Sequence, residues 1–183
     1  SSTTSYSGLA ANSYPVIVQD ANGCQFSTTA TVSNSSGPTA LAVTYTDATC
    51  GNSNGTATIG ATTGGVLPLS YSFNGGVFTT TTSYTALAAG TYTVIVKDAN
   101  GCTFTTTVTI SNIAGPTALA VTSTNSTCGN SNGTVTIGAV TGGTTPFTYS
   151  FNGSPFTATT AYNSLAAGTY TVIVKDANGC TFT

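Results

Sequence analysis

The stretch LAAGTYTVIVKDANGC, from Leu87 to Cys102, decides the fold of this chain. It returns unchanged at Leu165–Cys180 and in altered form, as LAANSYPVIVQDANGC, at Leu9–Cys24. The closing cysteines of successive copies are 78 residues apart, and a fixed period of this kind is typical of a repeat protein. The sequence therefore predicts an array of small, similar units.

Each copy of this stretch has the pattern of a β-hairpin. From Tyr92 to Lys97, the side chains at positions 92, 94 and 96 alternate with those at 93, 95 and 97, which is the two-residue period of a strand. Asp98-Ala-Asn-Gly101 is typical of a turn, because Asp can cap its own turn and Gly adopts left-handed backbone. The Thr- and Val-rich run Thr103–Ile110 suits the returning strand. The predicted turn positions are Asp20, Gly23, Asp98, Gly101, Asp176 and Gly179.

The repeat period divides the chain into three parts. Residues 1–37 correspond to the C-terminal half of a repeat, residues 38–115 form a complete repeat, and residues 116–183 form a repeat that lacks the end of its last strand. The third part aligns with residues 38–105 without a gap, and 53 of the 68 positions are identical. Pro38 and Pro116 mark short junctions between parts, which favours a rod.

Seven short segments with strand patterns follow one another in the complete repeat, separated by Gly, Asn and Pro turn signals. These segments are 41–46, 55–61, 69–73, 77–81, 83–87, 91–97 and 103–110. The pattern predicts an all-β chain of tandem seven-stranded antiparallel sandwiches, immunoglobulin-like or fibronectin type III-like, arranged head to tail. The motif Leu-x-x-Gly-x-Tyr also resembles a tyrosine corner, in which a Tyr hydroxyl bonds to the preceding turn. The expected corner residues are Tyr14, Tyr92 and Tyr170.

Two substitutions in the first copy bear on this interpretation. Asn12 replaces Gly90, which is compatible with a tight turn because Asn tolerates left-handed backbone. Pro15 replaces Thr93 in a strand that we expect to be central, and it removes a donor from the hydrogen-bond ladder. The sequence offers no compensation for this loss.

Composition excludes several classes of function. Charged residues make up 3% of the chain, the net charge is −2, and there is no His. Nucleic-acid binding and attachment to an anionic membrane both need clustered cations, but Lys97 and Lys175 are the only two. No apolar run is long enough to insert into a membrane. No nucleophile stands with an activating base, so we expect neither an enzyme nor a cofactor.

Five regularly spaced cysteines, with no CxxC pair, predict disulfides rather than a metal site, and hence an extracellular protein. Two pairings are open. Cys50 can pair with Cys180 across repeats, or Cys50 with Cys102 and Cys128 with Cys180 within repeats. The two cysteines of one repeat are expected at opposite poles of a sandwich, about 26 Å apart for an eight-residue strand. A disulfide needs Cα atoms within about 7 Å. Cys24 has no partner in this sequence under either pairing.

Three groups of residues are candidates for sites of chemistry. The turn aspartates lie beside Asn residues, but a calcium site needs six or more oxygen ligands, so turn capping is favoured over a metal. Lys97 and Lys175 are expected to point outward from their strands rather than to form an internal crosslink, because the equivalent position in the first copy is Gln19 and not Lys. Aromatic residues at fixed strand positions favour core or cross-strand packing over a sugar-stacking face. These aromatic residues are Tyr71, Phe73, Phe78, Tyr84 and Phe104.

Several of these motifs together resemble the SprB-type repeat of Bacteroidetes gliding-motility surface adhesins. The matching features are Cys50 followed by GNSNGT, the Gly64-Gly65…Pro68 turn before YSFNG, and the stretch from Leu87 to Cys102. They recur at Cys128, Gly142-Gly143…Pro146 and Leu165–Cys180. The family often has Trp at the positions of Phe73 and Phe151, so an aromatic residue is retained. The resemblance implies large surface proteins of the bacterial cell, exported by the type IX secretion system, that serve adhesion and gliding.

Together these observations predict a non-catalytic segment of a long, repetitive extracellular adhesin stalk or surface fibre that acts as a stiff spacer. Its expected partners are neighbouring repeats of the same chain, with lateral copies in a fibre and surface glycans as further candidates. Two other functions stay open from the sequence, a self-assembling filament subunit and an array of carbohydrate-binding modules. The charge-poor, Thr-rich surface suits the first of these, and the repeated aromatic residues suit the second.

Overall fold

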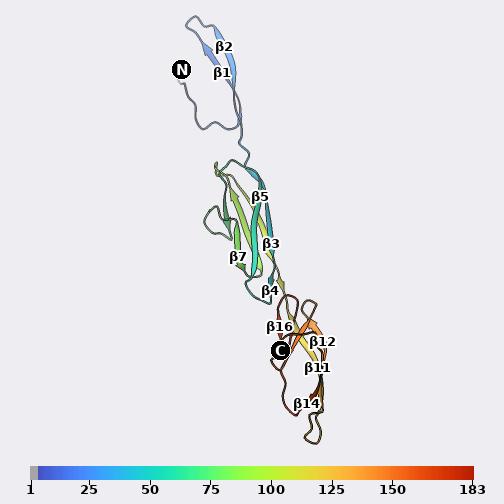
Figure 1. Ribbon diagram of the computed structural model, residues 1–183. Helices are drawn as coiled ribbons and strands as arrows, with labels where there is room; N and C mark the ends of the chain where they lie inside the picture. The colour runs from blue at the N-terminus through green and yellow to red at the C-terminus, as the bar shows by residue number, and fades with distance from the viewer. Residues whose placement is uncertain (1–3) are drawn as a thin grey trace.

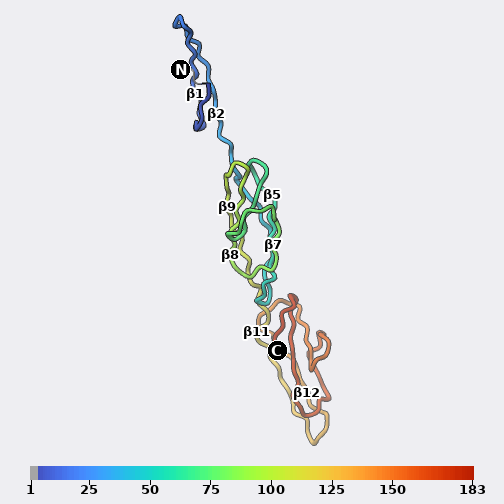
Figure 2. The backbone as a smooth tube through the Cα atoms, turned by 90° about the vertical axis from the view of Figure 1, so that its left-hand side faces the viewer, coloured from blue at the N-terminus to red at the C-terminus, as the bar shows by residue number. Residues whose placement is uncertain are grey.

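The computed structural model describes residues 4–183, which form β-strands and turns and contain no helix. The chain runs as three slender bodies placed one after another, as Figure 1 and Figure 2 show from two directions. The N-terminal hairpin lies at one end, the complete repeat in the middle and the third repeat at the other end. The all-β prediction is confirmed: the strands form several small sheets, which are antiparallel apart from one two-residue pair.

The strands follow the repeat period. The first part is a hairpin of β1 (Asn12–Gln19) and β2 (Gln25–Val32). The complete repeat contains β3 (Pro38–Thr46), β4 (Ala48–Thr49), β5 (Gly55–Gly64), β6 (Ser70–Phe73), β7 (Ser83–Leu87), β8 (Gly90–Lys97), β9 (Thr103–Ile110) and β10 (Asn112–Ile113). The third repeat contains β11 (Pro116–Thr124), β12 (Gly133–Gly142), β13 (Thr148–Phe151), β14 (Ala161–Leu165), β15 (Val172–Lys175) and β16 (Thr181–Phe182).

Two three-stranded sheets build the complete repeat, with the strand orders β3-β5-β7 and β6-β8-β9. The middle strands β5 and β8 pair antiparallel with both of their neighbours. The third repeat has the same arrangement, with the orders β11-β12-β14 and β13-β15-β16. Equal sequence patterns therefore give equal sheets in the two repeats.

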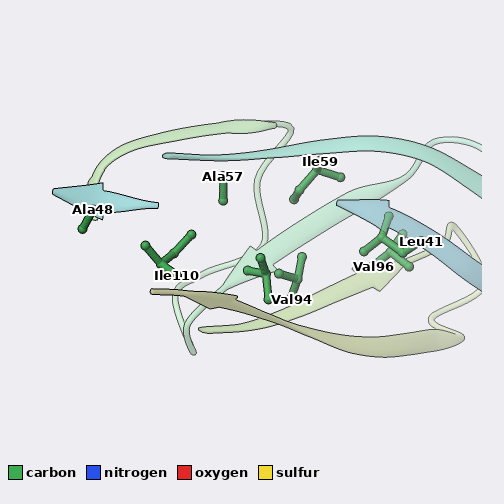
Figure 3. Close-up of a cluster of buried hydrophobic side chains, with 8 residues drawn as sticks. Leu41, Ala48, Ala57, Ile59, Val94, Val96 and Ile110 are labelled. Carbon is green, nitrogen blue, oxygen red and sulfur yellow. The ribbon is translucent and has the colours of Figure 1, made fainter. Parts of the chain in front are cut away.

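The core of the complete repeat lies between its two sheets. Ala57 and Ile59 of β5 point toward Val94 of β8 and Ile110 of β9 (Figure 3). These side chains come from alternate positions of their strands, so one face of each sheet is apolar. A fully buried Val or Ile contributes about 1.5–3 kcal/mol relative to the exposed side chain. The third repeat has a matching cluster around Ile137, Tyr149 and Val174.

The N-terminal hairpin has the same sequence pattern, but no second sheet packs against it within residues 4–183. Val94 is 0% exposed in the complete repeat, whereas its counterpart Val16 is 46% exposed in β1. Burial of this pattern therefore depends on the opposing sheet and not on the hairpin itself.

The hairpin also explains how Pro15 is tolerated. At the counterpart position, the carbonyl of Thr93 accepts a hydrogen bond from Asn74 N at 2.7 Å, on the side of β8 that faces β6. The N–H and C=O of one residue in an antiparallel strand point to the same side. The N–H that Pro15 lacks would therefore point away from β2, and the pairing of Pro15 with Thr29 is kept.

One predicted strand of the complete repeat is not formed. The segment 77–81 contributes only an isolated bridge between Thr79 and Tyr71. Thr79 N donates to Tyr71 O at 2.9 Å and Tyr71 N donates to Thr79 O at 2.7 Å, but the pairing extends no further. The third repeat behaves alike, with a bridge between Thr157 and Tyr149. The neighbouring strand β6 has only four residues, which limits how far this pairing can extend.

Candidate functional site

The junction between the complete and the third repeat brings together three segments that are distant in the sequence. These are the loop 47–54 after β3, the linker 111–115 and the hairpin turn 176–180 between β15 and β16. Cys50 of the loop and Cys180 of the hairpin form a disulfide, with their Cα atoms 5.2 Å apart. The two repeats are therefore joined covalently at a second place besides the backbone.

Of the two cysteine pairings that the sequence leaves open, the structure contains the one across repeats. Cys50 follows the C-terminal end of β3, whereas Cys102 lies beside Gly37, just before β3 begins. A strand of nine residues spans about 30 Å, which is far beyond the reach of a disulfide. The pairs Cys50–Cys102 and Cys128–Cys180 within repeats therefore do not form. Within residues 4–183, the free cysteines are Cys24, Cys102 and Cys128.

The linker is held against the loop of its own repeat by a short parallel pairing of β10 with β4. Ala48 N donates to Ser111 O at 2.9 Å, and Cys50 N donates to Ile113 O at 3.0 Å. Two side chains add to this pairing. Asp47 Oδ1 accepts from Ser111 N at 2.7 Å, and Asn112 Oδ1 accepts from Gly51 N at 2.9 Å. We call this set of bonds the linker clamp. It fixes where the chain leaves one repeat before it enters the next.

The loop presents Cys50 in a defined conformation. Cys50 has a φ of 57°, in the left-handed region that non-Gly residues rarely adopt. The side chain of Asn54 closes the loop by accepting from Thr49 N and donating to Thr49 Oγ1, both at 2.8 Å. Cys128 occupies the same loop of the third repeat, with a φ of 53°. The loop is thus formed in the third repeat although Cys128 has no disulfide there.

The other half of the junction is positioned by a buried aspartate. Asp176 is 4% exposed. Its Oδ1 accepts from Asn178 N at 3.0 Å and from Cys180 N at 2.9 Å, and its Oδ2 accepts from Thr144 N at 3.1 Å. The carboxylate therefore ties the hairpin turn, and the cysteine that ends it, to the loop after β12.

The other two hairpin turns show which of these contacts are local. Asp98 makes the equivalent bonds to Asn100 N, Cys102 N and Val66 N. The exposed Asp20 makes only the two bonds within its own turn. The turn glycines Gly23, Gly101 and Gly179 have φ values of 88°, 85° and 82°, which favour glycine.

Close packing at the linker makes a small residue necessary at Gly115. A Cβ atom at this position would lie 2.4 Å from Cys180 Cβ, and a Cβ at Gly37 would lie 2.6 Å from Cys102 Cβ. Cys102 is therefore placed at the first junction as Cys180 is placed at the second. Residues 1–37 contain no counterpart of the Cys50 loop, and Cys102 is a free cysteine within residues 4–183.

The three predicted tyrosine-corner residues make the same hydrogen bond. Tyr14, Tyr92 and Tyr170 donate their hydroxyls to the carbonyls of Ala10, Ala88 and Ala166, at 2.8, 2.9 and 3.0 Å. Each bond closes the turn that leads into the strand carrying the tyrosine.

Comparison with known families identifies the repeated unit. The SprB repeat matches residues 42–78 and 120–156, which begin within β3 and β11 and include the loops of Cys50 and Cys128. The SprB repeat is thus found at two positions of the chain. SprB repeats are found in surface adhesins of gliding motility, where they are non-catalytic structural repeats. No curated protein matches the chain.

The aromatic side chains of the complete SprB repeat mostly face the core. Phe73 stacks on Tyr84 with ring centroids 4.0 Å apart and on Tyr92 at 5.3 Å. Tyr71 and Phe104 also pack against the buried cluster. Phe78 is the exposed member of the five candidate aromatic residues, and Lys97 Nζ lies 4.0 Å from the centroid of its ring. Lys97 thus points outward and covers an aromatic face.

Two cavities of the third repeat lie where the complete repeat places the end of β9. One, of about 350 Å³, is lined by Gly133, Leu165 and Gly168 among others. In the complete repeat, the Cγ2 atom of Ile110 packs against Gly55, the counterpart of Gly133. The second cavity is lined by Leu119, Val172 and Phe182 among others.

Across residues 4–183, no group of three or more His, Cys, Asp or Glu residues is placed to hold a metal ion. The same residues contain no helix long and apolar enough to cross a membrane.

Replacing Asp176 with asparagine is expected to destabilise the third repeat by about 1.5–3 kcal/mol, the range for a hydrogen bond to a charged group. The amide keeps one acceptor for Asn178 N and Cys180 N, but its NH₂ would face Thr144 N. Urea unfolding of Asp176→Asn measures the loss. The matched control is Asp20→Asn, whose carboxylate uses a single oxygen and should change stability by no more than about 0.5 kcal/mol. Equal losses for the two variants would contradict a tie to the loop after β12.

Removing the hydroxyl of Tyr92 is expected to destabilise the complete SprB repeat by about 0.5–1.5 kcal/mol, the net contribution of one neutral hydrogen bond. Tyr92→Phe keeps the ring that stacks on Phe73 and removes only the bond to Ala88 O. Tyr45→Phe is the control, because Tyr45 is 53% exposed on β3. Urea unfolding should separate the two variants, and a silent Tyr92→Phe would show that the corner contributes nothing.

Proposed function

We propose that this chain is a stiff spacer segment of a long, repetitive extracellular adhesin, which holds a distal part away from the cell surface. The observation that carries this proposal is the disulfide between Cys50 and Cys180, which joins two repeats beside a backbone linker that is itself clamped. Two connections at separate points resist bending and twisting that a single linker would allow. A junction held in this way transmits orientation from one repeat to the next.

We infer further that each repeat is an immunoglobulin-like sandwich. The strand orders β3-β5-β7 and β6-β8-β9 correspond to the A-B-E and C-F-G strands of that architecture. Tyr92 near the start of β8, bonded to Ala88 O, corresponds to the tyrosine corner at the start of strand F. The N- and C-termini of a sandwich of this kind lie at opposite poles, which suits head-to-tail stacking.

An extracellular, cell-surface location is supported by chemistry and by family. A disulfide persists in an oxidising compartment, and the cytosol of most bacteria would reduce it. SprB repeats are known from surface adhesins of gliding motility. Export by the type IX secretion system and a role in adhesion or gliding are therefore part of the proposal.

Carbohydrate recognition is not favoured by the arrangement of aromatic residues. Four of the five aromatic residues that could stack on a sugar pack against the core, and the fifth is covered by Lys97. A sugar-stacking site needs exposed, unoccupied ring faces, so the repeats are better suited to a mechanical role.

The proposal predicts that the shape of the chain depends on the disulfide. Small-angle scattering of the full chain should give an extended particle with a narrow distribution of maximum dimension when it is oxidised. Reduction, or Cys50→Ser, should broaden this distribution and lower the radius of gyration, since only the linker clamp then holds the junction. Cys24→Ser is the control, because Cys24 lies in the hairpin and takes no part in this junction. An oxidised chain as variable in shape as the reduced one would refute a stiff spacer.

A further inference from the structure

We propose that the disulfide between repeats carries tensile load past most of the two repeats that it joins, so that unfolding of residues 51–179 adds no length to the stretched chain. This inference deepens the proposed spacer function and rests on it for its biological meaning. Its physical basis is the connectivity of the chain, which can be tested separately from stiffness.

The position of the disulfide defines the covalent route along which tension travels. Cys50 and Cys180 are separated by 130 positions, and the segment between them contains every strand from β5 to β15. A force applied to the two chain ends acts on residues 1–50, crosses the disulfide and continues from Cys180 to Thr183. Residues 51–179 lie in a closed loop outside this route. They bear no sustained tension once the route is taut.

The effect on length is large. A fully extended chain spans at most about 3.3–3.6 Å per residue. The whole chain of 183 residues can therefore reach about 600–660 Å when reduced. The route through the disulfide contains 54 residues, 50 up to Cys50 and four from Cys180, and reaches about 180–200 Å. Oxidation thus removes about 430–460 Å from the contour length of the stretched chain, corresponding to the 129 residues of the loop.

The two halves of an equivalent junction are present elsewhere in the chain. Cys102 lies against Gly37 as Cys180 lies against Gly115. Cys128 lies in the same left-handed turn as Cys50, and Asn132 closes that turn by bonding to Thr127 as Asn54 bonds to Thr49. Each repeat therefore has one cysteine placed to bond to the repeat before it and one placed to bond to the repeat after it.

In an array of such repeats the closed loops overlap. The hairpin cysteine of one repeat and the loop cysteine of the next are 26 residues apart, as Cys102 and Cys128 are. The shortest covalent route then advances two repeats, or 156 residues, through 26 residues and one disulfide, about 90 Å when fully extended. A folded repeat is at least as long as its ten-residue strand β5, about 33 Å. Two folded repeats thus already span about 66 Å, so even complete unfolding would lengthen the array by less than half.

This arrangement separates folding from load bearing. Tandem domains joined only by a linker lengthen several-fold when force unfolds them, because the whole domain enters the stretched chain. Here the folded repeat has only to place the cysteines, and the covalent route then limits extension. The spacer would keep its reach under forces that break its hydrogen bonds.

Single-molecule force spectroscopy on the full chain, held at its two ends, tests the inference. The oxidised protein should reach a total contour of no more than about 200 Å before the tether breaks. Adding a reductant during the pull should release about 430–460 Å more. Cys180→Ser should give the long contour without reductant. Replacing Cys24, Cys102 and Cys128 together with Ser should leave the short contour unchanged, which excludes other pairings.

The outcomes separate the two proposals. An oxidised chain whose contour exceeds about 200 Å, with the Cys50–Cys180 peptide present on non-reducing mapping, would overturn the load route. Absence of that peptide from the oxidised protein would overturn it as well. A short contour together with a shape-variable particle in scattering would refute the stiff spacer and leave the load route standing.

Discussion

Replacing Gly115 with alanine is expected to leave Cys50 and Cys180 unpaired and to raise the number of free thiols in the oxidised protein from three to five. The added Cβ would lie 2.4 Å from Cys180 Cβ and 3.7 Å from its Cα. Rotation of the cysteine side chain cannot relieve this overlap, because the position of a Cβ atom is fixed by the backbone. The hairpin turn must move away from the linker, and a disulfide tolerates little change in Cα separation.

Alkylation of the unfolded, unreduced protein followed by mass spectrometry counts the free thiols. The matched control is Gly37→Ala, which creates the same overlap with Cys102 at the first junction. Cys102 is already free, so the count in this variant should stay at three. A count of three in Gly115→Ala would mean that the junction can form at a greater separation than the structure shows.

Truncation of Ile110 to alanine is expected to destabilise the complete repeat by about 2–5 kcal/mol, the range for a large buried aliphatic side chain. Ile110 is 1% exposed and fills the space between the two sheets at the end next to the linker. Domains of this size have stabilities of about 5–15 kcal/mol, so the loss is a large fraction of the total. It should also loosen the linker clamp, which begins one residue later at Ser111.

Urea unfolding of Ile110→Ala measures this loss in the oxidised protein. Ile113→Ala is the control, since the same side chain on the linker is 37% exposed and its removal should cost less than about 1 kcal/mol. Similar shifts for both variants would indicate that the cavity at Ile110 collapses without penalty.

The strand pattern predicted the class of fold because the alternation of apolar and polar residues is local. The hairpin pattern of Leu87–Cys102 recurs in all three parts, and a hairpin forms at Asn12–Val32 even without a partner sheet. The same pattern could not predict burial there. Val94 and Val16 have the same place in their copies, and only the presence of an opposing sheet decides that one is buried and the other exposed.

The junction was predictable in part. The regular cysteine spacing suggested disulfides, and the pole-to-pole distance favoured a bond across repeats, but two pairings satisfied the sequence. The parallel pairing of Asn112–Ile113 with Ala48–Thr49 had no sequence signal, because two residues show no periodicity. Segment 77–81 is the reverse case, in which a predicted strand does not form. Its strand pattern is clear, yet only Thr79 pairs, since the neighbouring strand β6 has four residues.

The linker clamp and the disulfide together require every repeat to keep the same length. They place no such requirement on the number of repeats. One residue inserted between Ser111 and Gly115 would displace the next repeat by about 3.3 Å and carry Cys180 away from Cys50. Gain or loss of a whole 78-residue unit by recombination between the nearly identical copies restores every junction, because each copy has both cysteines at the same spacing. We therefore expect related genes to differ in reach by whole repeats and to keep the period of each repeat constant.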